Sequence, residues 1–150
     1  MARILLITNL YPPQELGGYG RCMSDYCWGL QKRGHKIEVL TSNAPYLGPS
    51  GPYNNTVVHR DLKLKGSYNN GITFIQDKNL CRTIDKENGD ALLSLVRKGW
   101  DAVLIGNVDL IGPELLLTVV SLGLPTVHHI GFTTPPFQSI FAQINQKNYK

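Results

Sequence analysis

Apolar residues along the chain gather into short continuous runs, separated by longer stretches with a helical period. The runs cover residues 3–9, 36–41, 57–62, 102–105 and 125–130, and we predict a β-strand in each. Continuous apolar strands joined through helices are typical of parallel sheets that are covered on both faces. The third run is more polar than the others, so we expect that strand near an edge of the sheet.

The first predicted helix covers residues 21–33 and ends at Gly34, a residue that suits the position after a helix. Its apolar residues recur at helical spacing and predict a buried stripe, made of Cys22, Met23, Tyr26, Cys27 and Leu30. Ser24 and Asp25 fall on the opposite, solvent-facing side. Gly29 inside the helix costs about 1 kcal/mol relative to alanine, and we attribute it to a close approach of helix and sheet.

Two further helices are predicted downstream. Residues 85–98 carry an apolar face of Ala91, Leu92, Leu95 and Val96, with Asp85 as N-cap. Residues 113–122 begin with a proline at the first helical position and are apolar almost all round, so we expect this helix to be well buried. Residues 63–82 show no clear period, and residues 72–75 fit either a strand or a helix start.

Strands and helices alternate throughout, so right-handed crossovers give a doubly wound parallel sheet. We therefore predict an α/β fold that is Rossmann-like, with three α/β/α layers and the strand order 3-2-1-4-5. In such sheets ligands bind beyond the carboxyl ends of the strands, near the point where the strand order reverses. This places the loop after Asn9, the loop after Asn107 and residues 128–132 together.

The loop that leads into the first helix contains Gly17, Gly18 and Gly20. Backbone N–H groups at a helix start, with no side chain to block approach, form a site for phosphate or another anion. The alternative is that the glycines only make a turn. The dinucleotide fingerprint G-x-G-x-x-G is not met, because Met23 stands where the third glycine belongs.

Three segments taken together resemble the start of the group 1 (family 4-like) glycosyltransferases. They are Asn9-Leu10-Tyr11-Pro12-Pro13, the glycine segment 17–21, and residues 30–41 with the sequence LQKRGHKIEVLT. These are retaining enzymes of the two-domain B-type (GT-B) fold, and the resemblance extends more loosely to about residue 132. It implies an acceptor-binding N-terminal domain, whose glycine loop faces the diphosphate of a nucleotide sugar across a cleft.

The resemblance and the topology nominate substrate- or phosphate-binding residues, which are Gly17, Gly18, Tyr19, Gly20, Arg21, Asn107 and His128. Each has a structural alternative: Arg21 as a solvated helix-start residue, Asn107 and Asp109 as a capped turn, His128 as a packing residue. Similar transferases often end the last of these strands in a His-Asp or His-Gly pair that contacts the sugar. That pair aligns with residues 131–132 here, so the catalytic residue is unassigned and His129 is a weak candidate.

The charge pattern bears on whether the chain binds nucleic acid. The net charge of +4 is spread in small groups, without a stripe of basic residues alternating with aromatic ones, so we do not expect nucleic-acid binding. Three cysteines, Cys22, Cys27 and Cys81, indicate structural thiols in a reducing cytosol, and no Cys/His cluster predicts a metal. No apolar run is long enough for a membrane span, although a peripheral membrane contact stays compatible with the sequence.

The sequence therefore predicts one Rossmann-like domain over residues 1–150, with a linker or tail at 133–150. Retaining GT-B enzymes carry a Glu-x7-Glu motif in a C-terminal nucleotide-sugar domain, and the four glutamates here show no such spacing. We expect half of a hexosyltransferase-type enzyme that is inactive alone, with a nucleotide diphosphate sugar as donor, a sugar or lipid-linked acceptor, and no cofactor. The alternatives are a stand-alone flavodoxin-like binding module and a dinucleotide-dependent oxidoreductase.

Overall fold

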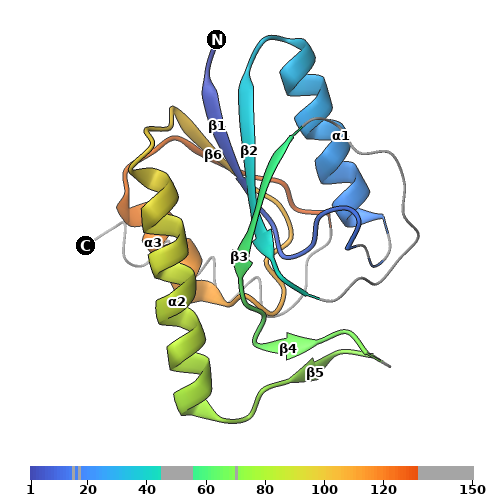
Figure 1. Ribbon diagram of the computed structural model, residues 1–150, viewed down its shortest axis with the longest axis vertical. Coiled ribbons are helices and arrows are strands. Elements are labelled where there is room, and N and C mark those ends of the chain that lie inside the picture. The colour runs from blue at the N-terminus through green and yellow to red at the C-terminus, as the bar shows by residue number, and fades with distance from the viewer. Residues whose placement is uncertain (15, 17, 45–55, 70, 132–150) are drawn as a thin grey trace.

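Five parallel strands form the centre of the fold (Figure 1). They are β1 (Arg3–Ile7), β2 (Lys36–Ser42), β3 (Val57–Leu62), β6 (Ala102–Ile105) and β7 (Thr126–His128). The computed structural model describes residues 1–14, 16, 18–44, 56–69 and 71–131. The strand order is β3-β2-β1-β6-β7. The predicted order 3-2-1-4-5 is thus confirmed, and the polar strand β3 lies at an edge as expected.

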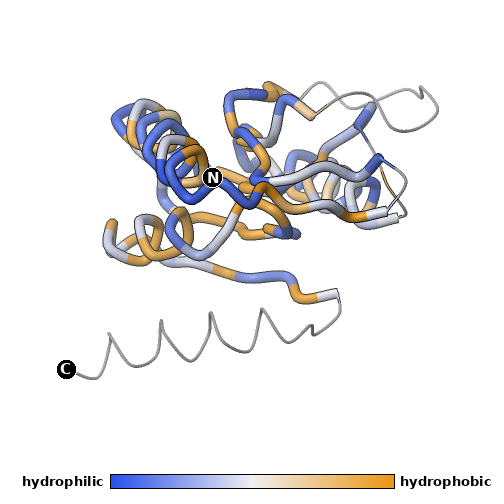
Figure 2. Tube along the Cα trace, turned by 90° about the horizontal axis from the view of Figure 1, so that it is seen from below, coloured by the Kyte–Doolittle hydropathy of each residue, from blue (hydrophilic) through white to orange (hydrophobic). Residues whose placement is uncertain are grey.

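Helices cover both faces of this sheet. On one face α1 (Tyr19–Lys32) packs Met23 and Cys27 against Leu6 and Val39 of the strands. On the other face α2 (Lys78–Val96) and α3 (Pro113–Ser121) share a larger core with β1 and β6. The apolar positions are concentrated in the interior, between helices and strands (Figure 2). The three-layer α/β/α architecture is confirmed.

Helix α1 begins at Tyr19, two residues before the predicted start. Its buried stripe also differs from the prediction in two places. Tyr26 is 45% exposed, whereas Ser24, which we expected in solvent, is 6% exposed. The helix is rotated so that Gly20, Met23, Ser24 and Cys27 face the sheet, and Cys22 and Leu30 are only half-buried.

The explanation predicted for Gly29 is wrong. A Cβ atom at Gly29 would meet only the Arg33 guanidinium, at 3.6 Å, and no strand. The close approach of helix and sheet occurs instead at Gly106, just after β6. A Cβ there would lie 2.7 Å from Met23 Sδ and 3.0 Å from Thr8 Oγ1.

Helix α2 is longer than predicted, because it begins at Lys78 rather than near residue 85. Its N-cap is Asp77, whose carboxylate accepts hydrogen bonds from the backbone N–H groups of Asn79 (2.8 Å) and Leu80 (3.2 Å). Asp85 lies inside the helix and forms an ion pair with Lys65, at 2.6 Å.

The segment without a clear period forms a small antiparallel hairpin, β4 (Gly66–Ser67) with β5 (Thr73–Phe74). Its base is attached to the main body, since Lys65 N–H donates to the carbonyl of Leu110 (2.6 Å). Helix α3 has Pro113 in its first turn, as predicted. It is buried along one face, through Leu115, Leu116 and Val119, while its other positions are half-buried or exposed, so it is less buried than its apolar sequence suggested.

Strand β7 is shorter than the predicted 125–130 and its Val127 is 64% exposed. All three cysteines are free thiols, and Cys27 is buried. None of the helices in the part of the chain that the structure describes is long and apolar enough to cross a bilayer. The predicted linker at 133–150 lies outside the described residues.

Candidate functional site

A cavity of about 380 Å³ opens at the carboxyl ends of β1 and β6, the two strands between which the direction of winding reverses. Its lining comes from three separated segments of the chain and comprises Asn9, Leu10, Leu16, Gly18, Tyr19, Gly20, Tyr68, Ile72, Asn107 and Asp109. The predicted site residues Gly18, Tyr19, Gly20 and Asn107 thus meet in one cavity. Gly17 lies outside the described residues.

Asn9, two residues after the end of β1, makes hydrogen bonds to each of the other segments that line this cavity. Its backbone N–H donates to the carbonyl of Asn107 (2.6 Å). Its side-chain Nδ2 donates to the Tyr68 hydroxyl (2.6 Å) and to the carbonyl of Asp109 (3.2 Å). Because Asn9 is 2% exposed, these bonds are shielded from water and fix three segments relative to one another.

The glycine loop enters α1 without a side-chain cap from any described residue, and the first turn carries no acidic side chain. Gly18 is the N-cap, is exposed, and would accommodate a Cβ atom with no described residue within 4 Å. The positive end of the helix dipole therefore lies at the cavity, whose lining includes Gly18, Tyr19 and Gly20. This arrangement suits an anionic group, as the glycine spacing predicts.

Tyr19 links this helix start to the end of β7. Its hydroxyl donates to the backbone carbonyl of His129, and the same oxygen lies 3.2 Å from His129 Nδ1. The His129 ring also packs against Tyr26, with ring centroids 5.2 Å apart. The weak catalytic candidate His129 is thus held against α1, and it is not among the residues that line the cavity.

His128 lies on the other face of the sheet, because it is in register with Ile105, which packs under α2 and α3. Burial lowers the pKa of His128, and the positive charge of a protonated His129 would lower it further, while a hydrogen bond with the Gly106 backbone opposes both effects. Neither His128 nor the exposed Arg21 lines the cavity. Both remain predictions for substrate binding.

The turn after β6 contains Asn107 and Asp109, which are hydrogen-bonded to each other and also line the cavity. The Asn107 side chain accepts a hydrogen bond from the Asp109 N–H (3.0 Å), which is the capped turn that the sequence allowed as an alternative. Burial raises the pKa of the Asp109 carboxyl, and the Asn107 side chain opposes this shift.

Tyr68 is a cavity residue that the sequence did not nominate. Burial first, and then the nearby Asp109 carboxylate, raise the pKa of Tyr68 to about 12, so its hydroxyl stays protonated. It comes from the end of β4, in the segment without a readable period. Asn9 belongs to the strand-end motif 9–13, but nothing in the sequence signals its role as the central hydrogen-bond donor.

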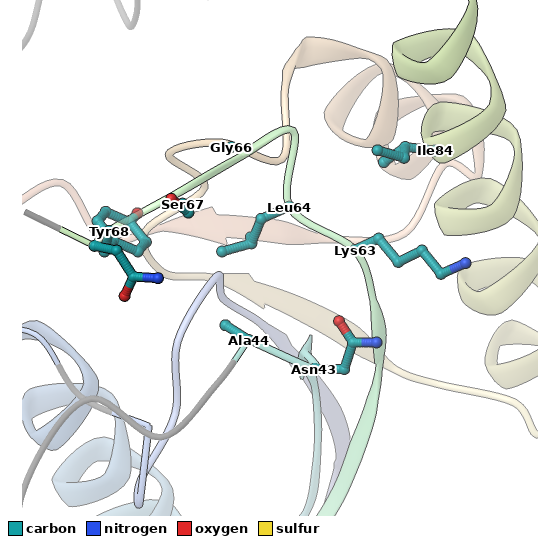
Figure 3. A pocket seen from close by; sticks show the side chains of 9 residues that line it. Asn43, Ala44, Lys63, Leu64, Gly66, Ser67, Tyr68 and Ile84 are labelled. Atoms are coloured by element: carbon teal, nitrogen blue, oxygen red, sulfur yellow. The ribbon is translucent and has the colours of Figure 1, made fainter. Parts of the chain in front are cut away.

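A second cavity, of about 250 Å³, lies at the carboxyl ends of β2 and β3, beneath the hairpin (Figure 3). Its lining residues are Asn43, Ala44, Lys63, Leu64, Gly66, Ser67, Tyr68, Asn69 and Ile84. Tyr68 belongs to both cavities. Within the described residues, no group of three His, Cys, Asp or Glu side chains is arranged to hold a metal ion.

No protein-family pattern matches the sequence, and no curated protein matches it. Among solved structures, the chain is similar to MurG of Acinetobacter baumannii, with a TM-score of 0.56 and 16% sequence identity. The match covers 97% of this chain and 39% of the MurG chain. MurG is a glycosyltransferase of the GT-B fold. The chain therefore has a GT-B-like domain fold and spans well under half the length of that neighbour.

Proposed function

We propose that the chain is the acceptor-binding half of a retaining glycosyltransferase, which transfers a sugar from a nucleotide diphosphate sugar to a hydroxyl acceptor. The observation that carries the proposal is the cavity at the β1/β6 edge, where an uncapped helix start and the Asn9–Asn107 contact come together. The GT-B-like fold supports the same class of reaction. A nucleotide-sugar domain would form the opposite wall of the cleft.

Positioning and electrostatics would supply most of the catalysis in such an enzyme. The N–H groups of the first turn of α1 would stabilise negative charge on the leaving diphosphate. Asn107 and Tyr68 both line the cavity and would orient the acceptor hydroxyl. We assign no catalytic base, and His129 remains a weak candidate.

The direct test is a titration of the ¹⁵N-labelled chain with UDP-glucose, UDP-N-acetylglucosamine, GDP-mannose and ADP-glucose. We expect one donor to shift the backbone amide signals of Gly18, Tyr19, Gly20 and Asn107. The Kd should be weak, about 1 mM, because the domain that binds the nucleotide contributes nothing here. Nuclear magnetic resonance measures both the affected residues and the Kd.

Gly18→Glu is the informative variant, since a Cβ there meets no described residue within 4 Å and the carboxylate would compete with the diphosphate. It should abolish the donor-induced shifts, whereas Ser94→Glu on the exposed side of α2 should retain them. Micromolar binding of NAD or flavin mononucleotide would overturn the proposal. That result would favour the stand-alone binding module or the oxidoreductase.

A further inference from the structure

The two cavities at the carboxyl edge of the sheet are neighbours. One lies over the ends of β1 and β6, the other over the ends of β2 and β3, and these four strands are adjacent in the sheet. Three gaps of about 4.8 Å between adjacent strands give a width of about 14 Å. A ligand that occupied both cavities would have to be longer than one sugar ring.

Tyr68 forms the boundary between the two cavities. Its hydroxyl is fixed by Asn9 Nδ2, 2.6 Å away, and the preceding Ser67 hydroxyl pairs with Thr73 across the hairpin at 2.8 Å. These bonds hold the phenol ring at the end of the hairpin. A fixed aromatic ring between two cavities offers an apolar face to a ligand that passes from one to the other.

The lining of the second cavity is more apolar than polar, and its one charged side chain, Lys63, is paired with a carboxylate. The Asn43 and Asn69 side chains are exposed and make no side-chain hydrogen bond within the described residues. The ammonium group of Lys63 pairs with Glu87 at 2.8 Å, and Figure 3 shows its side chain directed away from Tyr68. The two asparagine amides lie in the same cavity lining as the apolar side chains of Ala44 and Leu64. This combination fits a neutral ligand that carries both hydroxyl groups and apolar ring faces.

We propose that this edge binds an acceptor of at least two linked sugars, with the reacting unit in the β1/β6 cavity and the next unit in the β2/β3 cavity. Tyr68 contacts both units and sets the direction of the acceptor. The inference rests on the proposed function, which defines the first cavity as the place of transfer. It adds the class of acceptor, a glycan, and a second subsite that recognises its length.

The test compares methyl glycosides of one and of two sugars on the labelled chain: methyl glucoside with methyl maltoside, methyl mannoside with methyl mannobioside, and methyl N-acetylglucosaminide with methyl chitobioside. At least one disaccharide should bind about 10-fold more tightly than its monosaccharide, a difference of about 1.4 kcal/mol. It should also shift the amide signals of Asn43, Ser67 and Asn69, which the monosaccharide leaves unchanged.

The double variant Asn43→Ala/Asn69→Ala should reduce the affinity for that disaccharide to the affinity for the monosaccharide. Asn79→Ala, an exposed asparagine on α2, is the matched control and should change neither. Equal affinities for the two lengths, a gain that survives the double variant, or no binding of any glycoside up to about 50 mM would each overturn the inference. Donor-induced shifts at Gly18 in the same sample would show that the proposed function itself stands.

Discussion

At the scale of single residues, Gly29 and Gly106 show how differently two glycines are used. Gly29 lies in the last turn of α1, where a Cβ would touch only the flexible end of Arg33 among the described residues. Gly106 lies at a close approach of the sheet and α1, against the fully buried side chains of Met23 and Thr8. Only the second position requires a glycine for packing. The first carries the usual cost of glycine inside a helix without a compensating contact.

Gly29→Ala should therefore stabilise the chain by about 0.5–1 kcal/mol, because alanine lowers the conformational entropy of the unfolded chain and favours the helix. Urea denaturation followed by circular dichroism measures the change in the free energy of unfolding. Gly89→Ala in α2 should behave in the same way, since a Cβ there meets nothing within 4 Å.

Gly106→Ala is the opposite case and should destabilise by about 1–3 kcal/mol, since overpacking moves side chains that have no free space. Met23→Ala should relieve part of this cost, so the double variant should lose less than the sum of the two single changes. A destabilising Gly29→Ala together with a neutral Gly106→Ala would contradict the placement of α1 on the sheet.

The candidate site could be predicted only where the chemistry is local in sequence. Gly18, Tyr19, Gly20 and Asn107 were found because helix starts and strand ends have recognisable signals, and topology brings these ends together. Tyr68 could not be found in this way. Its contact with Asn9 joins residues 59 positions apart and depends on how the hairpin folds back.

At the scale of elements, α2 shows why the boundaries of helices are harder to predict than their existence. Asp77 and Asp85 are both acidic residues ahead of an apolar period, so either fits the N-cap position in sequence. Asp77 is the cap, whereas the Asp85 carboxylate is used by Lys65. The first two turns of α2 are mostly polar and lack the period that identified its second half.

Asp77→Ala should destabilise the chain by about 1 kcal/mol, because the N–H groups of Asn79 and Leu80 lose their acceptor. Thermal unfolding measured by calorimetry gives the change. Asp90→Ala on the same helix removes only an exposed pair with Lys86 and should stay within about 0.5 kcal/mol. Equal effects of the two changes would argue that α2 begins further along the chain.

At the scale of the whole molecule, the fold followed from the sequence because alternation and handedness leave few topologies for a chain of this pattern. The order of the five strands could be predicted without knowing any side-chain contact. The contacts that attach the hairpin β4–β5 to the rest of the fold could not be predicted from the sequence. Lys65 joins Asp85 of α2 at 2.6 Å and Glu114 of α3 at 3.0 Å, while its backbone N–H bonds to Leu110. One residue thereby connects the hairpin, two helices and the turn that carries Asp109.

Lys65→Met should loosen the hairpin more than the sheet. Burial on its own would lower the pKa of Lys65, but the hydrogen bonds to Asp85 and Glu114 raise it, so the ammonium form is the one that stabilises the fold. Its loss leaves two carboxylates facing each other and should cost about 1–2 kcal/mol, since Glu114 is half-exposed to water. Hydrogen exchange should accelerate most at the amide of Ile75, which donates to the Lys65 carbonyl.

The control for this variant is Lys86→Met, which breaks a pair exposed on the outer side of α2 and should leave hydrogen exchange of the hairpin unchanged. The same variant tests whether the hairpin takes part in sugar binding. If the hairpin lines the β2/β3 cavity that binds the second sugar, loosening it in Lys65→Met should weaken disaccharide binding while leaving the donor-induced shifts at Gly18 in place. Unchanged exchange at Ile75 would instead mean that the backbone bond between Lys65 and Leu110 alone secures the hairpin, and that the ion pairs serve only the packing of α2 against α3.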